Sequence, residues 1–168
     1  MSDRETVRVS YLELRQAPAP PRARAGPERV GREPLGPAAY LALYRAVGGP
    51  VRWDQRLRMP AGELSALLGS ARLAIYMLRR GAAPLGFCEF DRGDFPDVEL
   101  KNFGLVPEAQ GQGLGPWLLA SALEAEWRER PRRIWLHTDT WDHPAAIPVY
   151  RRAGFTVYAV RDESPGPL

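Results

Sequence analysis

The chain has 168 residues, which suits one domain with a hydrophobic core of its own. Hydrophobic residues make up 45% of it, yet no apolar run approaches the roughly 20 residues that span a bilayer, so we do not expect a membrane protein. The formal charge of +3 is compatible with an anionic ligand and does not by itself indicate nucleic-acid binding. Cys88 is the only cysteine, which excludes an internal disulfide, and residues 1–10 are charged rather than signal-like, so we expect a cytoplasmic protein.

The N-terminal part of the chain begins with an alternating stretch, residues 6–14, that predicts a strand. Residues 15–37 are rich in proline and arginine. Proline at that density excludes a continuous helix, so we expect a solvated connector here. A basic arm that shapes an acceptor site is the alternative. Nucleic-acid binding is disfavoured because the arginines are diluted by prolines and no helix aligns them.

The middle of the chain predicts two helices followed by three strands. The helices are expected at residues 37–47 and 60–69, and the first has Pro37 in its first turn. The three strands are expected at residues 73–78, 85–90 and 98–105. Short turns rich in glycine and proline separate these strands, as in antiparallel hairpins.

A glycine-rich loop follows the last of these strands. Gly111, Gly113 and Gly115 stand at every second position, directly before a helical pattern over residues 116–129. Such a loop suits a phosphate, because glycine permits close approach of the backbone and unpaired N–H groups at a helix start favour negative charge. The spacing fits neither a dinucleotide-binding fingerprint nor a P-loop.

The C-terminal part predicts a strand, a helix and a closing strand, at residues 133–138, 143–153 and 155–160. The element order therefore indicates an α/β fold with one mixed sheet of six to seven strands, antiparallel at its start and parallel at its finish. About four helices are expected to cover both of its faces. No internal repeat or second domain is seen, so residues 1–168 are read as one domain.

Two motifs resemble those of the GNAT N-acetyltransferase superfamily. Gln110, Gly113 and Gly115 match the acyl-CoA-binding pattern Gln/Arg-x-x-Gly-x-Gly/Ala. About 30 residues later, a segment is similar to Asn-x-x-Ala-x-x-Leu-Tyr-x-x-x-Gly-Phe, with matches at Ala146, Tyr150, Gly154 and Phe155. This segment departs from the pattern at two positions, where His143 replaces asparagine and Val149 replaces leucine.

The resemblance implies a GNAT fold whose fourth and fifth predicted strands splay apart to admit the pantetheine arm of acetyl-CoA. Backbone around residues 103–106 is then expected to pair with that arm, and the loop amides are expected to bind the pyrophosphate. The residues implied in cofactor binding are Phe103, Leu105, Val106, Gln110, Gly111, Gln112, Gly113, Leu114, Gly115, Pro116, His143 and Tyr150. His143 is expected to bind pantetheine or to stabilise the helix start, and no metal is expected.

By the same resemblance, this is an acetyltransferase that acts on an amine, with Tyr150 as the general acid for the departing thiolate. Pro148 is expected to kink the helix that carries Tyr150, and Asp142 to cap that helix. The general base stays open. Glu99 matches a family glutamate, and Glu89, His137 or a water chain are alternatives.

The acceptor is not identified by the sequence. Candidate acceptor-binding residues are Trp53, Asp54, Arg56, Glu89 and His137. Their acidic and aromatic side chains would suit a cationic amine, whereas the arginines would suit an acceptor carboxylate. A small molecule, an amino acid or peptide, and a protein amine all remain candidates. A catalytically silent acyl-CoA-binding module is the alternative function, and the oligomeric state is left open, with a homodimer as one alternative.

Overall fold

The computed structural model describes residues 6–164, so residues 1–5, half of the charged N-terminal stretch, lie outside the described residues. One sheet of seven strands, in the order β2-β3-β4-β5-β6-β1-β7, runs through the described part of the chain. The strands are β1 (Val7–Leu14), β2 (Glu28–Arg32), β3 (Leu73–Arg80), β4 (Ala83–Asp94), β5 (Asp97–Leu105), β6 (Arg133–Asp139) and β7 (Thr156–Glu163).

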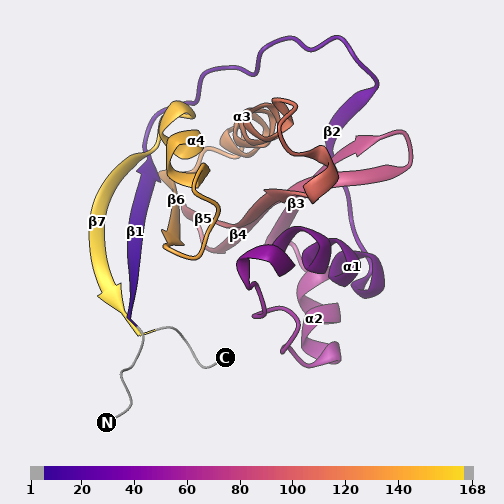
Figure 1. Cartoon of the computed structure of the whole chain (residues 1–168), viewed down its shortest axis with the longest axis horizontal. Coiled ribbons are helices and arrows are strands. Elements are labelled where there is room, and N and C mark those ends of the chain that lie inside the picture. Colours follow the sequence, from indigo (N-terminus) through magenta and orange to yellow (C-terminus); the bar gives the residue numbers. More distant parts are fainter. Residues whose placement is uncertain (1–5, 165–168) are drawn as a thin grey trace.

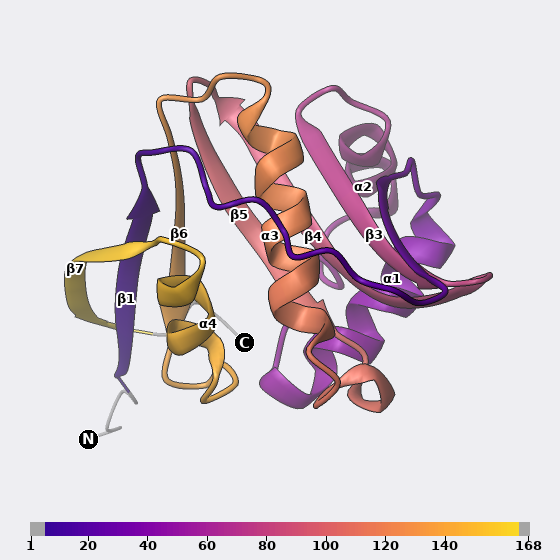
Figure 2. The ribbon, with the colours of Figure 1, turned by 90° about the horizontal axis from the view of Figure 1, so that it is seen from above.

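Four α-helices cover the two faces of this sheet, as expected (Figure 1). They are α1 (Pro37–Gly48), α2 (Ala61–Leu68), α3 (Leu114–Trp127) and α4 (Ala146–Arg152), and two short 3-10 turns occur at η1 (Gly49–Val51) and η2 (Pro107–Ala109). The helices α1 and α2 lie on one face, and α3 and α4 lie on the other (Figures 1 and 2). No helix in the described part of the chain is long and apolar enough to cross a membrane.

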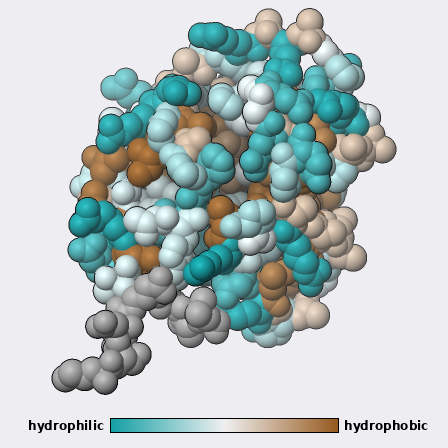
Figure 3. All heavy atoms as spheres, viewed as in Figure 1, coloured by the Kyte–Doolittle hydropathy of each residue, from teal (hydrophilic) through white to brown (hydrophobic). Residues whose placement is uncertain are grey.

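The core lies between these layers. Side chains of β3 and β4 are buried along most of both strands, because helices pack on each face of the sheet there. Leu118, Leu119 and Leu123 of α3 are fully buried against that sheet. Hydrophilic residues cover much of the molecular face seen in Figure 3, with hydrophobic residues exposed between them.

The mixed sheet is confirmed and its last three strands in the sequence, β5, β6 and β7, run in the same direction, but β1 interrupts the expected parallel finish. Only β5 and β6 pair in parallel, whereas β6 pairs with β1 and β1 with β7 in antiparallel fashion. The reason is that the N-terminal strand inserts between the last two strands of the chain. Sequence order gave no sign of this insertion, because it depends on contacts between residues 120 or more positions apart, such as Arg133 with Glu13 (2.9 Å).

The splay between β5 and β6, the fourth and fifth strands predicted from the sequence, is confirmed. Their pairing is restricted to three residue pairs, from Asp97 with Arg133 to Glu99 with Trp135. Just beyond, the register of β5 against β4 passes from Leu100 to Asn102, so Lys101 is an extra, bulged residue. A bulge bends its strand, and this one lies where β5 leaves β6.

The proline-rich connector contains a strand that the sequence analysis did not predict. Residues 28–32 form β2, which pairs antiparallel with β3 at the edge of the sheet. Arg24 lies over the Trp117 ring at 5.8 Å, and the trace between β1 and β2 crosses α3 (Figure 2). An edge strand tolerates nearby prolines, because one of its sides needs no ladder hydrogen bonds. The segment is therefore a strap over α3 and not merely a solvated connector.

Candidate active site

A cavity of about 1070 Å³ lies at the splay. Its wall is formed by β5, the glycine-rich loop, the start of α3, the end of β6, α4 and the loop after α1. The predicted site residues on this wall are Trp53, Asp54, Phe103, Leu105, Gln110, Gly111, Gly113, Leu114, Gly115, Pro116, His137, His143 and Tyr150. Elements distant in the sequence thus bring most of the candidates to one place.

The glycine-rich loop closes one end of the cavity. Gly111 and Gly113 have φ values of +75° and +73°, in the left-handed region that favours glycine. Gly113 is the N-cap of α3, so the N–H groups of the first helical turn begin here. Pro116 is the third residue of this helix, where its missing N–H removes no intrahelical bond. The loop therefore has the backbone of an anion site.

The outer residues of this loop are arranged differently from expectation. The Gln112 side chain donates to the Glu108 carbonyl (3.1 Å) and accepts from Arg80 (3.1 Å), and it is not part of the cavity wall. Val106 is buried, and its N–H donates to the Leu85 carbonyl of the β4 segment (2.8 Å). That amide is consequently occupied by the sheet.

The alternation of a strand decides which β5 groups remain for a ligand. Since the amide of Val106 faces β4, the backbone groups of Phe103 and Leu105 face away from β4, toward the splay. No β6 residue pairs with β5 beyond Glu99 among the described residues. An extended ligand can therefore add to this edge as a further strand would.

Tyr150 of α4 is the buried polar side chain on the opposite wall. It is 9% exposed, and its ring packs against Phe103 (centroids 5.9 Å apart) and Phe155 (5.9 Å). Burial raises the pKa of its phenol above the ordinary range, and the nearby charge of Asp142 acts in the same direction. The hydroxyl accordingly keeps its proton at neutral pH and can donate it.

The start of α4 differs from the prediction in three respects. The helix begins at Ala146, so Asp142 does not cap it. Instead, the Asp142 carboxylate accepts from the Thr138 hydroxyl and from the Asp139 amide (3.2 Å). Pro148 is the third residue of the helix, where no intrahelical bond is lost, so it has no reason to kink the helix.

His143 lies in the turn before α4. Its Nδ1 accepts from the Ala145 amide (3.1 Å), and its carbonyl accepts from the Ala146 amide (2.9 Å). The side chain therefore stabilises the turn that leads into the helix, which was one of its two expected roles. It also lines the cavity, so the second role, contact with pantetheine, stays a prediction.

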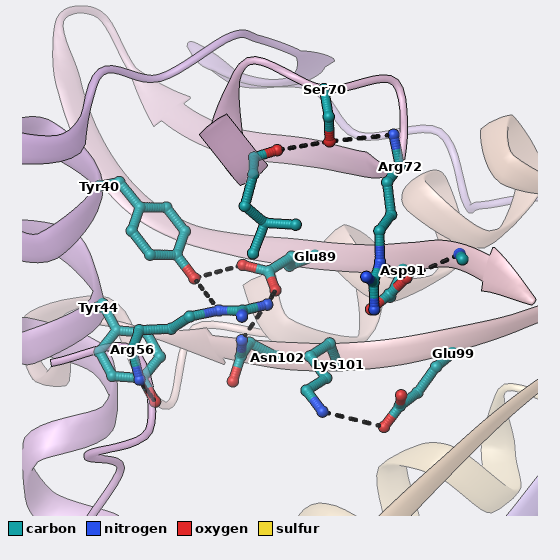
Figure 4. Close-up of polar contacts among 12 residues, drawn as sticks. Tyr40, Tyr44, Arg56, Ser70, Arg72, Glu89, Asp91, Glu99, Lys101 and Asn102 are labelled. Atoms are coloured by element: carbon teal, nitrogen blue, oxygen red, sulfur yellow. Dashed lines mark hydrogen bonds and ion pairs between the residues drawn. The ribbon is translucent and has the colours of Figure 1, made fainter. Parts of the chain in front are cut away.

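Glu99 lies just outside the cavity wall, behind two residues that line it. Its Oε1 is 3.7 Å from Lys101 Nζ and 3.6 Å from His137 Nε2, and the ion pair with Lys101 is drawn in Figure 4. The His137 side chain is 47% exposed and packs against the Tyr11 ring at 5.9 Å. Glu99 can thus reach the cavity only through His137 or Lys101.

Glu89 and Arg56 do not line the cavity. The Glu89 side chain is fully buried, and its Oε2 accepts from Arg56 (2.5 Å) and from Asn102 (3.2 Å). The Tyr40 hydroxyl donates to its other oxygen (Figure 4). This network joins the loop after α1 to β4 and β5. A direct contact with an acceptor, as the sequence analysis expected of both residues, finds no support in this geometry.

Sequence reasoning did not predict one contact between two residues that line the cavity. The Arg52 guanidinium lies 5.2 Å from the centre of the Trp141 ring, and both residues line the cavity. Arg52 has φ +64°, a backbone conformation that is uncommon outside glycine. The residue types gave no signal for this contact, because it joins the loop after α1 to the loop after β6.

The model of the acetyltransferase (GNAT) family matches residues 43–155 of this chain. The chain belongs to the GNAT acetyltransferase family. This match spans α1 to the start of β7 and includes the glycine-rich loop and Tyr150. No group of three or more His, Cys, Asp or Glu side chains that could hold a metal occurs in the described part of the chain.

Two curated relatives are mycothiol acetyltransferases. The protein from Arthrobacter sp. (strain FB24) is 32% identical over 136 residues, which is 70% of this chain and 38% of the relative. The protein from Pseudarthrobacter chlorophenolicus is 30% identical over 164 residues, which is 84% of this chain and 47% of the relative. The GNAT chain therefore spans less than half the length of these relatives.

Solved structures share the fold. A GCN5-related N-acetyltransferase from Sphaerobacter thermophilus superposes with a TM-score of 0.63 at 20% identity, covering 96% of this chain and 53% of that chain. A tandem GNAT protein from the clavulanic acid biosynthesis pathway gives a TM-score of 0.63 at 18% identity, with coverage of 99% and 56%. At these identities the likeness shows the GNAT fold alone.

Proposed function

We propose that this chain transfers an acetyl group from acetyl-CoA to a primary amine of a small molecule, an amino acid or peptide, or a protein. Membership of the GNAT acetyltransferase family supports acetyl transfer in general. The observation that carries the proposal is the cavity at the splay, which joins an anion-binding loop, a free strand edge and a protonated tyrosine.

The residues present fit acetyl-CoA. The amides from Gly111 to Gly115 would hold its pyrophosphate, and the free edge of β5 at Phe103 and Leu105 would pair with its pantetheine arm. The volume of the cavity suits a ligand larger than an ordinary small molecule. When bound, acetyl-CoA supplies the activated acetyl group.

The chemistry needs two proton movements. The acceptor nitrogen must lose a proton before it can attack, and the thiolate must gain one as it leaves. We assign to Tyr150 the donation of a proton to the thiolate, and two features support this: burial keeps its hydroxyl protonated, and its side chain lines the cavity. Glu99 would act through His137 or Lys101, since these two contact partners of Glu99 line the cavity.

Release of free CoA tests the proposal. Purified protein and acetyl-CoA would be mixed with primary amines that include alkylamines, amino acid amides and lysine peptides, and the new thiol would be titrated with a chromogenic disulfide. We expect thiol release that depends on the amine, together with the acetylated amine by mass spectrometry. Binding of acetyl-CoA without thiol release from any amine would favour the catalytically silent acyl-CoA-binding alternative.

A further inference from the structure

A carboxylate without a cationic partner lies on the cavity wall. Asp142 follows β6 and lines the cavity, and its carboxylate accepts hydrogen bonds from the Thr138 hydroxyl and the Asp139 amide. Both of these donors are neutral. They orient the carboxylate and leave its charge uncompensated.

The cations of the same wall are engaged elsewhere. Lys101 pairs with Glu99 (3.7 Å), Arg58 pairs with Asp54 (3.1 Å), and Arg52 lies over the Trp141 ring. No ion pair of the described residues includes Asp142 or its neighbour Asp139. A partly buried carboxylate next to a second carboxylate is costly, unless a ligand brings a positive charge.

This environment raises the pKa of the Asp142 carboxyl. Burial raises the pKa of its carboxyl, the Thr138 hydrogen bond opposes that rise, and the charge of Asp139 adds to it. The other charged or titratable groups around it are Tyr150 on α4, Arg52 at the cavity mouth and His143 in the next position. A carboxyl with a raised pKa is a better proton acceptor than an ordinary surface aspartate.

A second observation concerns Tyr150, the proposed proton donor. Tyr150 is 9% exposed and lines the same cavity, and its hydroxyl has no hydrogen-bond partner within residues 6–164. The charge of Asp142 is close enough to raise the pKa of the Tyr150 phenol. Among the described residues, the Tyr150 hydroxyl has no hydrogen-bond partner and the Asp142 carboxylate has no cationic partner, and both residues line the same cavity.

We propose that Asp142 binds the ammonium form of the acceptor amine and takes its proton, so that this site selects amines that are cationic in solution. The indoles of Trp53 and Trp141 also line the cavity, where Trp53 packs against Tyr44 and Phe87 and Trp141 lies under the Arg52 guanidinium. The inference rests on the proposed acetyl transfer. It assigns to Asp142 the first proton transfer that the sequence analysis left among Glu99, Glu89, His137 and a water chain.

The proton and electron balance is simple. The ammonium proton passes to an Asp142 oxygen, and the freed nitrogen lone pair forms the C–N bond with the acetyl carbonyl carbon. The C–S electron pair leaves on sulfur, which takes the Tyr150 proton. The second nitrogen proton restores the Tyr150 hydroxyl, and Asp142 releases its proton to solvent through the cavity mouth.

The variant Asp142→Asn tests this role, because asparagine can still accept from Thr138 and Asp139. Thiol release would be measured with propylamine, which is cationic at neutral pH, and with hydroxylamine, which is largely neutral there. We expect kcat/KM for propylamine to fall about 100-fold and that for hydroxylamine to stay within about threefold. Asp91→Asn, a carboxylate paired with Arg72 (2.8 Å) away from the cavity, serves as the control and leaves both rates unchanged.

Two readouts besides activity complete the test. Calorimetric titration of propylammonium into the protein–CoA complex should show binding that Asp142→Asn weakens, while affinity for acetyl-CoA stays the same. The melting temperature of Asp142→Asn at neutral pH should not be lower than that of the wild type. Because the pKa of the Asp142 carboxyl is raised in the folded state, the wild-type protein loses folding stability as the pH rises through that pKa and the carboxyl ionises. Asparagine removes that cost.

Equal losses for both nucleophiles, or a fall in melting temperature, would mean that Asp142 is structural and would overturn the inference. Failure of the proposed function looks different. In that case wild-type protein releases no thiol with any amine, and the propylammonium titration still decides whether Asp142 receives a cation.

Discussion

Tyr150 is the residue on which the proposed chemistry depends most directly. Removing its hydroxyl in Tyr150→Phe keeps the ring contacts with Phe103 and Phe155 and removes only the proton donor. We expect turnover to fall about 100-fold while the dissociation constant for acetyl-CoA changes little. Steady-state thiol release and calorimetry on the same preparation measure the two quantities. An undiminished rate would remove Tyr150 from the mechanism.

At the scale of residues, local spacing was enough to predict which loop and which tyrosine line the cavity, but not the contacts of other polar residues near it. Gly113 and Tyr150 were predictable because the conformation of the loop and the family motif are both encoded within a few positions. The contacts of Asp142 were not predicted, since it was expected to cap α4 and instead accepts from the Thr138 hydroxyl at the end of β6. The same holds for Glu89, whose burial depends on Arg56 from a loop 33 residues earlier.

At the scale of elements, the buried network around Glu89 holds the loop after α1 against the sheet. The Arg56 guanidinium is 5% exposed and Glu89 is fully buried. Replacing one partner leaves the other charge buried without compensation, so Glu89→Gln should cost about 3 kcal/mol of unfolding free energy. That corresponds to a melting temperature lower by roughly 10 °C.

Differential scanning calorimetry checks this, with Glu99→Gln as the matched control. The contacts of Glu99 with Lys101 and His137 are longer, at 3.7 and 3.6 Å, and involve partly exposed partners. Glu99→Gln should therefore lower the free energy of unfolding by less than about 1 kcal/mol. Equal effects of the two variants would contradict the role assigned to the Glu89 network.

A second set of ion pairs lies where β5 and β6 are still paired, at the end of the sheet away from the splay. Asp97 accepts from Arg132 (2.8 Å) and lies 3.4 Å from Arg133, at the first of the three paired positions of β5 and β6. The hydrogen bond from Arg132 is the main cause that lowers the pKa of the Asp97 carboxyl. A lowered folded-state pKa adds stability above the unfolded pKa of about 3.9, and this is lost as pH falls through the folded value.

Asp97→Asn should therefore lower the melting temperature at pH 7 by about 2 °C, because the partners are partly exposed and screening limits the gain. The difference from wild type should disappear in acid, once the pH has fallen through the lowered folded-state pKa of Asp97. Asp94→Asn, at the exposed end of the same hairpin, is the control. A difference that persists unchanged in acid would argue against the ion pair as its source.

The elements show where sequence patterns suffice. Apolar periodicity predicted the four helices and six of the strands, because each buries one face or both against the sheet. The strand β2 was missed, since its burial is slight and proline surrounds it. The order of β6, β1 and β7 was also beyond the sequence, because pairing between distant strands leaves no local pattern.

At the scale of the whole molecule, the two ends of the sheet differ: the strands are paired at one end and splayed at the other. The strands β3, β4 and the first part of β5 form a continuous core with helices on both faces. Beyond the bulge at Lys101, β5 leaves β6 and the cavity opens between them. The cavity therefore lies at the splayed end of the sheet, and the continuous core lies at its paired end.

The central claim is that this splayed end is an acyl-CoA site, and calorimetric titration with acetyl-CoA tests it most directly. Gly113→Val forces a side chain into the anion-binding loop, while Gly81→Val imposes a similar backbone strain, at φ +60°, in the β3–β4 turn away from the cavity wall. The account predicts binding to wild type, affinity at least tenfold weaker for Gly113→Val, and unchanged affinity for Gly81→Val. Absence of binding to wild type, or equal affinity for all three proteins, would contradict it.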